Sequence, residues 1–266
     1  MHKENNNTVL LEKEGKVAII RLNRPERYNA ITEELKWGLM HALNDIQKDD
    51  AIKAVILTGN GKGFCAGADM KDLQQAGSSD PKEIRDNLIM VYGNTTRMIM
   101  RSDKPVIAAI NGPVAGAGLG FALACDLRIM AEHANMRYAF INIGLVPDNG
   151  STWFLTRQVG YSKALELIIE GEKIPAKECL KLGLTNKVCK AEDLMDEAMK
   201  WAIRLANKPT AAIGGTKRIL NHAIANDWYS TVCKESEEQM PLFETHDHKE
   251  GVMAFVQKRK PNFIGK

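Results

Sequence analysis

The sequence predicts an α/β fold, because short apolar runs rich in β-branched residues alternate with stretches of helical periodicity. The first two runs are residues 17–22 and 54–58, and further buried strands are expected at 106–110 and 127–130. Between the first two strands, apolar residues recur at helical spacing: Ile31, Leu35, Leu39, Leu43 and Ile46. This alternation favours a layered core of strands and helices over an all-helical or all-β protein.

Helix signals follow in the same order along the chain. Thr32 can cap the first helix, and Glu33 and Glu34 place negative charge in its first turn, where free backbone N–H groups favour it. A second helix is predicted over about 81–100, and a third after the Gly/Ala-rich turn that follows residue 110. Each predicted strand of the core is therefore followed by a helix or a tight turn.

The pattern changes in the last third of the chain. From about residue 191 the strand signals fade, and two stretches of helical periodicity follow, separated by Pro209. One more helix is expected around residues 252–256, before a basic ending. The sequence thus predicts a core over residues 1–190 and a carboxy-terminal helical region over residues 191–266.

Composition and charge narrow the class of protein. No apolar run approaches the roughly 20 residues of a membrane-spanning helix, and residues 1–7 are polar, so we expect a cytoplasmic protein without a targeting segment. A net charge of +3 carries no nucleic-acid footprint and favours a small partner. Five cysteines without a Cys-x-x-Cys pair indicate reduced thiols rather than disulfides or a zinc site.

Several reaction centres are disfavoured by their motifs. The segment AGAGLG has Phe121 where the third glycine of a dinucleotide-binding loop should stand, and the chain contains neither a phosphate-binding G-x-x-x-x-G-K-[ST] loop nor a G-x-S-x-G elbow. His246 and His248 flank Asp247 at a predicted helix start, which favours a solvated cap over a metal site. Dinucleotide binding, kinase and serine-hydrolase chemistry are therefore not expected.

Two segments of small residues remain, GKGFCAGAD at 61–69 and NGPVAGAGLGFALACD at 111–126. Each follows a predicted strand and opens a predicted helix. Helix starts leave backbone N–H groups without partners, and small side chains let a ligand oxygen reach them. Tight packing of helix against strand is the favoured explanation of either segment by itself, and the pair together points toward a binding site.

Longer motifs occur in the order and spacing of the enoyl-CoA hydratase/isomerase, or crotonase, family, and the sequence resembles this family over nearly its whole length. They are LNRPERYNA (22–30), FCAGAD (64–69), KPVIAAINGPVAGAG (104–118), GLVPDNGST (144–152) and GVMAFVQKRKPNF (251–263). The resemblance implies a ClpP/crotonase-like spiral of ββα repeats with a carboxy-terminal helical trimerisation region, assembled as a homotrimer or a hexamer of two trimers. It also implies an acyl-CoA thioester substrate, with coenzyme A as part of it, and no metal or separate cofactor.

Carried over residue by residue, the resemblance assigns two oxyanion-hole donors to the backbone N–H groups of Ala68 and Ala117. They would hold the thioester oxygen while negative charge develops on it. The same comparison suggests contacts to coenzyme A from five further residues, of which the two cations would meet phosphates and Lys258 could serve a neighbouring subunit: Arg24, Ala66, Asp69, Met70 and Lys258.

The chain departs from the hydratases of the family at the positions of their two water-activating glutamates, which are Gly120 and Phe140 here. Neither residue can carry a proton, so hydration by two carboxylates lacks both of its acid/base groups. Asp148 is the remaining candidate. From its sequence context alone, it can equally be the N-cap of the helix that contains Trp153.

The resemblance favours Asp148 as a base, because the sequence GLVPD is closest to the ring-1,2-epoxyphenylacetyl-CoA isomerase subgroup. Burial among Phe140, Val146 and Trp153 is expected to raise its pKa. We therefore predict an acyl-CoA isomerase that shifts a double bond or rearranges a ring-derived thioester through an enolate. An atypical hydratase or lyase is the nearest alternative, and a non-catalytic acyl-CoA or RNA-binding module is the alternative from another class.

Overall fold

The computed structural model describes residues 7–69, 71, 74 and 80–266. In these residues, the main sheet has six strands in the order β1-β2-β3-β4-β6-β9. β1 pairs antiparallel with β2, and every other pair is parallel. The strands are β1 (Val9–Glu14), β2 (Val17–Leu22), β3 (Ala54–Gly59), β4 (Val106–Ile110), β6 (Leu127–Ala131) and β9 (Lys187–Cys189).

The buried centre of this sheet explains why its strands were visible in the sequence. Every residue of β3 and β4 is buried, as expected for parallel strands that are covered on both faces. Ile20 of β2 lies opposite Leu57 of β3, which in turn lies opposite Ala108 of β4. The four predicted strands are confirmed, with β3 and β6 each one residue longer than expected.

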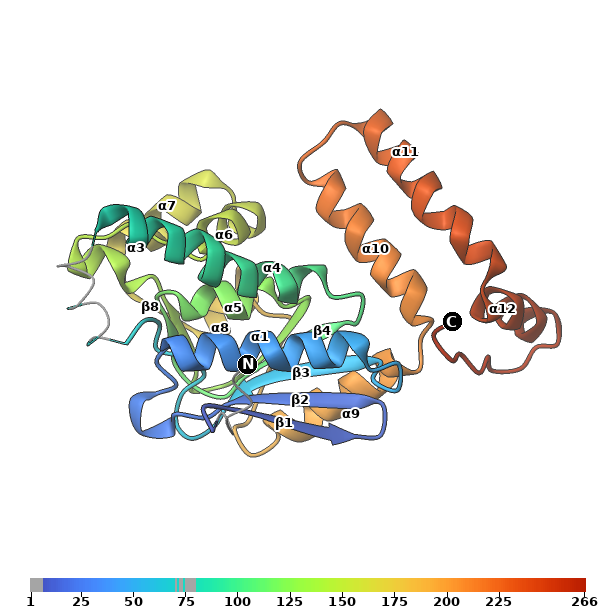
Figure 1. The fold of residues 1–266 in the computed structure, drawn as a ribbon, viewed down its shortest axis with the longest axis horizontal. Coiled ribbons are helices and arrows are strands. Elements are labelled where there is room, and N and C mark those ends of the chain that lie inside the picture. The colour runs from blue at the N-terminus through green and yellow to red at the C-terminus, as the bar shows by residue number, and fades with distance from the viewer. Residues whose placement is uncertain (1–6, 70, 72–73, 75–79) are drawn as a thin grey trace.

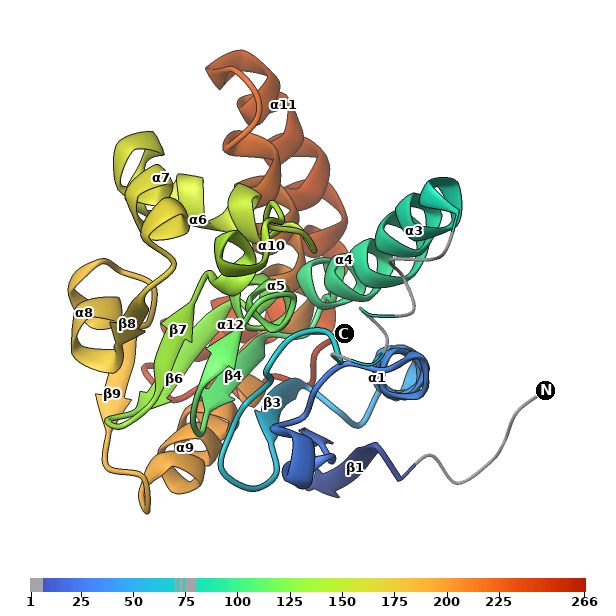
Figure 2. The same ribbon diagram turned by 90° about the vertical axis from the view of Figure 1, so that its left-hand side faces the viewer.

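Helices cover both faces of the sheet (Figure 2). α9 packs across β2, β3, β4 and β6, whereas α1 packs against β1 and β2, and α4 packs against α1 and α5. Thr32 caps α1 as predicted, because its side chain accepts a hydrogen bond from the Leu35 N–H. The core helices are α1 (Glu33–Lys48), α3 (Pro81–Asn87), α4 (Gly93–Arg101), α5 (Gly118–Ala124), α6 (Ser151–Val159), α7 (Tyr161–Glu170), α8 (Ala176–Lys181) and α9 (Leu194–Ala206).

Short elements complete the core. The helical stretch expected over about 81–100 is confirmed, and it consists of α3, a π-helical turn at Leu88–Tyr92 and α4 without a break. A second sheet has the order β5-β7-β8, and 3-10 turns occur at Pro25–Arg27 and Ala139–Ile143. Its strands are β5 (Val114–Ala115), β7 (Asn135–Arg137) and β8 (Lys173–Pro175).

The last helices leave the core. α10 (Thr210–Ala223) and α11 (Trp228–Gln239) lie side by side and project away from the sheets, and α12 (His246–Val256) follows the 3-10 turn Met240–Glu244 (Figure 1). α9 packs on the main sheet, and the projecting helices begin with α10. The division at residue 190 stays a prediction. In the described part of the chain, no helix combines the length and the hydropathy needed to cross a bilayer.

Candidate active site

The first small-residue segment runs beside Ile31 in an extended conformation. The Ile31 N–H donates to Gly67 O at 2.7 Å, and the Asp69 N–H donates to Ile31 O at 3.0 Å. Because these bonds use the groups on either side of Ala68, the N–H of Ala68 points away from Ile31. It donates no hydrogen bond to another described residue. This N–H is therefore free to bind a ligand oxygen.

The second segment places Ala117 at the start of α5. Gly116 turns the chain with a φ of 53°, and Ala117 occupies the N-cap position without a side-chain cap. Ala117 is 2% exposed, and within the described ranges its N–H donates no hydrogen bond. Buried backbone N–H groups nearly always have partners. An unpaired one in this position is the arrangement expected of a binding site.

Gly67 brings the two segments together. Its φ is 89°, and a Cβ atom on it would lie 2.9 Å from Ala115 O and 3.2 Å from Ala117 N. Only glycine permits both this backbone conformation and this approach. Ala68 and Ala117 thus belong to two backbone segments in direct contact. The small residues of these segments, whose role the sequence did not decide, permit this contact.

Asp148 lies in the turn before α6 and is not its cap. The N-cap is Gly150, with a φ of 72° and no side-chain cap, so the capping interpretation is wrong. The N–H and hydroxyl of Ser151 donate to the backbone O of Asp148 at 3.0 Å and 2.8 Å. These bonds hold the turn through its main chain and leave the carboxylate for another role.

The Asp148 carboxylate is partly buried, and its Oδ1 is buried without a hydrogen-bond partner among the described residues. Loss of solvation raises its pKa from 3.8 to about 6. The direction of this shift confirms the prediction. Val146 is 81% exposed, however, so it does not supply the burial expected of it. A carboxylate with this pKa can accept and return a proton near neutral pH.

Asn149 connects the Asp148 turn to α5 and was missed in the sequence. Its Nδ2 donates to Ala117 O at 2.8 Å, and its Oδ1 accepts a hydrogen bond from the Thr96 hydroxyl of α4. A Cβ atom on Gly120 would lie 2.5 Å from Asn149 Nδ2 and 2.6 Å from its Cγ. Asn149 therefore fills the space into which a side chain at position 120 would project.

Phe140 lies on the same side of this arrangement. Its side chain is 6% exposed, and its Cζ would be 4.0 Å from a Cβ atom on Gly116. The two positions that the resemblance assigns to glutamates in hydratases are therefore a glycine closed off by Asn149 and a buried phenyl ring. Neither can activate water, whereas Asp148 lies one residue from the side chain that binds Ala117.

The proposed coenzyme A contacts divide between the two ends of the molecule. Arg24 Nη1 lies 3.1 Å from Asp69 Oδ2 and donates to Ala30 O at 2.6 Å. The Lys71 N–H and then Arg24 lower the pKa of Asp69. Ala66 is exposed on the same segment, and Met70 lies outside the described residues. Lys258 follows α12, which lies apart from the core sheet in Figure 1, whereas Arg24 follows β2 of that sheet.

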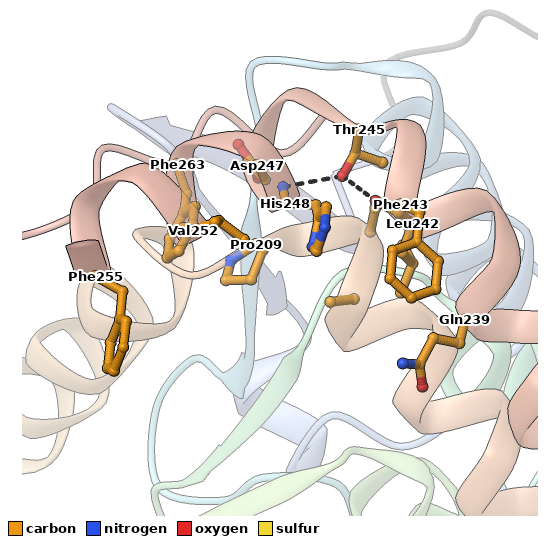
Figure 3. Close-up of a pocket in the computed structure, with 13 residues that line it drawn as sticks. Pro209, Gln239, Leu242, Phe243, Thr245, Asp247, His248, Val252, Phe255 and Phe263 are labelled. Carbon is orange, nitrogen blue, oxygen red and sulfur yellow. Dashed lines mark hydrogen bonds between the residues drawn. The ribbon is translucent and has the colours of Figure 1, made fainter.

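A cavity of about 480 Å³ lies in the helical region, away from these residues (Figure 3). Beside it, Thr245 caps α12 by accepting the His248 N–H at 3.1 Å. Asp247 is 3% exposed rather than solvated, and it accepts hydrogen bonds from the tail. The helix start predicted here is thus confirmed, but its cap is Thr245 and Asp247 is buried. In the described ranges, no three His, Cys, Asp or Glu side chains gather as a metal site. The cavity is lined by Pro209, Ala211, Ala212, Gln239, Leu242, Phe243, Thr245, Asp247, His248, Gly251, Val252, Phe255 and Phe263.

Comparison with known proteins identifies the class. Residues 12–266 match the enoyl-CoA hydratase/isomerase family, and the chain belongs to this family. It is 36% identical to the 1,2-epoxyphenylacetyl-CoA isomerase of Escherichia coli K12 over 258 residues, which are 97% of this chain and 98% of that one. It is 35% identical to the short-chain-enoyl-CoA hydratase of Clostridium acetobutylicum over 256 residues, 96% of each chain.

Solved structures agree with this assignment. A putative enoyl-CoA hydratase from Streptomyces coelicolor superposes with a TM-score of 0.93 at 30% identity, covering 100% of this chain and 97% of that one. An enoyl-CoA hydratase subunit from Geobacillus kaustophilus gives 0.90 at 34% identity, covering 97% and 98%. The crotonase fold and the family resemblance are therefore confirmed. Because the relatives include an isomerase and hydratases, the reaction has to be argued from the site.

Proposed function

We propose that the protein is an acyl-CoA isomerase in which Asp148 is the general base and the N–H groups of Ala68 and Ala117 form the oxyanion hole. The observation that carries this proposal is the Asp148 carboxylate, with a pKa raised to about 6 and one buried oxygen without a partner among the described residues. It is linked through Asn149 to Ala117, whose N–H is also unpaired within that set.

A single carboxylate is sufficient for a 1,3-proton shift. Asp148 removes a proton from C2 of a 3-enoyl thioester, and the electron pair moves through the carbonyl to give a dienolate. The two N–H groups stabilise its oxygen, and each such donor typically contributes about 3 kcal/mol. The Asp148 carboxyl then returns the proton to C4. The product is the conjugated 2-enoyl thioester, and the carboxylate is regenerated.

A ring-derived thioester is the second substrate class. The likeness to the E. coli protein named 1,2-epoxyphenylacetyl-CoA isomerase supports it, and so does the phenyl ring of Phe140 beside Gly116. The same base and oxyanion hole would serve, because this rearrangement also passes through an enolate of the thioester. Aliphatic and ring-derived substrates therefore differ in their demands on the pocket, rather than on the proton carrier.

An atypical hydratase or lyase is the alternative, and it is favoured by relatives that are named hydratases. In this case, Asp148 alone would have to activate water, because Gly120 and Phe140 carry no acid/base group. The isomerase agrees better with the site. A module that only binds acyl-CoA or RNA would leave the partnerless Asp148 oxygen without a role.

We also propose which residues contact coenzyme A and how copies of the chain assemble. Arg24, Ala66, Asp69 and Met70 would contact coenzyme A from the same chain, and no metal or separate cofactor takes part. Lys258 would come from another copy, because the α12 that precedes it lies apart from the core sheet (Figure 1). A homotrimer or a hexamer of two trimers is supported by large apolar side chains exposed on the projecting helices and on the turn between them: Leu220, Ile224, Trp228, Tyr229, Met240, Phe243, Val252, Met253, Phe255 and Val256. The cytoplasmic location stays a prediction.

The reaction class is tested by offering the protein a short 3-enoyl-CoA and, separately, a 2-enoyl-CoA. We expect the first to be converted to the conjugated thioester, and the second to gain water more slowly than the first is isomerised. A faster addition of water would favour the hydratase. If neither substrate reacts, a ring-1,2-epoxide thioester is tested in the same way. Binding without turnover of any of the three would favour the binding module.

A further inference from the structure

Asn149 is buried at a junction between three elements. It is 6% exposed and has a φ of 52°, a conformation that asparagine tolerates better than most residues. Its side-chain amide spans from Thr96 on α4 to the backbone of Ala117 at the start of α5. Both ends of the amide are thereby used within the protein, so Asn149 acts on its neighbours rather than on a substrate.

The acceptor at one end is the carbonyl of Ala117. This oxygen accepts hydrogen bonds from Asn149 Nδ2 at 2.8 Å and from the Gly120 N–H at 3.1 Å. The Ala117 N–H, on the same residue, is the proposed oxyanion donor. The N–H and the carbonyl lie in adjacent peptide planes that meet at the Ala117 Cα, so a side chain from the Asp148 turn holds the residue from which this N–H projects.

We propose that Asn149 and Thr96 are positioning residues, which fix the Ala117 N–H relative to Asp148 and so couple the oxyanion hole to the base. The inference rests on the proposed function. Thr96 orients the amide, because its hydroxyl donates to Oδ1 and leaves Nδ2 to face Ala117. Asp148 precedes Asn149 in the chain, and its own carbonyl is held by Ser151. The turn that carries Asp148 and the residue that carries the donor are thus joined through the Asn149 side chain.

The glycine at position 120 is part of this device. A side chain there would collide with Asn149, since even a Cβ atom would come within 2.6 Å of Cγ. The nearest atom to such a Cβ is the Asn149 backbone O, so the main chain and the amide of Asn149 together exclude a carboxylate at position 120 in this backbone. Gly120 thereby leaves the space that Asn149 needs to reach both Thr96 and Ala117.

The test compares Asn149→Gly and Thr96→Val, with Thr95→Val as the matched control. Glycine accepts the positive φ, so the first variant removes the amide without adding strain. Thr95 is buried on the same helix, but its hydroxyl donates to Val91 O of its own helix at 2.8 Å. The readout is the carbonyl stretching band of bound crotonyl-CoA labelled with ¹³C at C1, because this band moves to lower frequency when the oxyanion hole polarises the thioester.

We expect the wild-type band to lie below its frequency in solution, and Asn149→Gly to reverse most of the shift. Thr96→Val should reverse part of it, and Thr95→Val none. With a 3-enoyl-CoA, we expect kcat to fall roughly 10- to 100-fold in Asn149→Gly and about fivefold in Thr96→Val, with KM within twofold. The double variant should be no worse than Asn149→Gly, because Thr96 acts through Asn149.

The carbonyl band of the bound thioester reports on the oxyanion hole whether or not the protein isomerises its ligand. A shifted band that depends on Asn149, in a protein that isomerises nothing, would overturn the isomerase and leave the positioning role intact. The positioning role is overturned if Asn149→Gly and Thr96→Val keep the wild-type band and kcat, if Thr95→Val moves the band as far as Thr96→Val, or if bound and free thioester give the same band in the wild type.

Discussion

Asp148 and Asp247 are both aspartates with restricted access to solvent, but their carboxylates differ in the hydrogen bonds that they accept. At the start of α12, the two oxygens of Asp247 accept hydrogen bonds from the Ile264 and Gly265 N–H groups, each at 2.7 Å. In the turn before α6, Asp148 has a buried oxygen with no partner in the described residues. One carboxylate ties a terminal tail to a helix, and the other is kept available.

Burial has opposite consequences for a carboxylate that gains hydrogen-bond donors and for one that does not. A carboxylate that receives backbone N–H groups is stabilised as an anion and contributes to folding. A carboxylate that loses water without gaining partners costs folding free energy, and its pKa rises. The fold tolerates this cost at Asp148, one residue from the side chain that binds the Ala117 carbonyl, which agrees with a reactive group rather than a structural one.

The largest expected effect is a difference in catalytic activity between variants of the two aspartates. Asp148→Asn should lower isomerisation of a 3-enoyl-CoA by about 10³-fold, within the range for loss of a general base. Asp247→Asn should leave kcat per folded molecule within about threefold, because its side chain contacts the tail and His246 rather than the candidate site. Both are measured at pH 8 with matched amounts of folded protein. Equal losses of activity in the two variants would contradict different roles for the two aspartates.

Next in size is the dependence of stability on pH. Asp148 has a pKa of about 6 when folded against an ordinary 3.8. Below pH 3.8 both states bind the proton, and as pH rises through 6 the folded state is penalised. Asp148→Asn should therefore be more stable than wild type at pH 8, by at most about 3 kcal/mol. The gain should vanish near pH 4. Denaturant unfolding across this range measures it, and a variant less stable than wild type at pH 8 would contradict the burial argument.

A smaller loss of stability is expected when Asp247 loses its charge. In Asp247→Asn, the amide cannot accept from both tail N–H groups, so the free energy of unfolding should fall by about 2 kcal/mol. Asp193→Asn is the control, because Asp193 is exposed and makes no side-chain cap at α9. Denaturant unfolding compares the two variants. If they prove equally stable, Asp247 does not hold the tail.

The smallest effect concerns a second tie to the same tail. Glu250 accepts from Arg259 and from the Asn262 N–H, and these contacts lower its pKa from 4.5 to about 2. Its contribution to stability is present above pH 4.5 and is lost as pH falls toward 2. Glu250→Gln should therefore destabilise the protein at pH 7 by less than Asp247→Asn does. Limited proteolysis of the tail at pH 7 should show the same ranking.

The elements that sequence reasoning found share one physical property. β2, β3, β4 and β6 consist of continuous apolar runs, and α1 has both an apolar face and a cap, so their signals are local. β5, β7, β8 and β9 have two or three residues each, too few to show a period. β1 was also missed, because half of its residues are exposed.

The candidate site shows where local signals end. Ala68, Ala117 and Asp148 were named from motifs, but the choice between base and cap at Asp148 depended on the backbone of Gly150. In the sequence, Asn149 appears only as a member of the GLVPDNGST motif. Its partners lie 53 and 32 residues away in the chain, and such contacts leave no pattern in a single sequence. A buried asparagine in a turn opposite a glycine is the signal that the structure adds.

The central claim is that Asp148 carries the proton, and exchange of the C2 protons of a bound acyl-CoA in deuterated water tests it most directly. For the wild type, we expect an exchange rate that rises through a pKa of about 6 and then levels off. In Asp148→Asn, exchange should fall to the level without protein at every pH, with binding unchanged. Exchange at the wild-type rate in this variant would show that another group moves the proton.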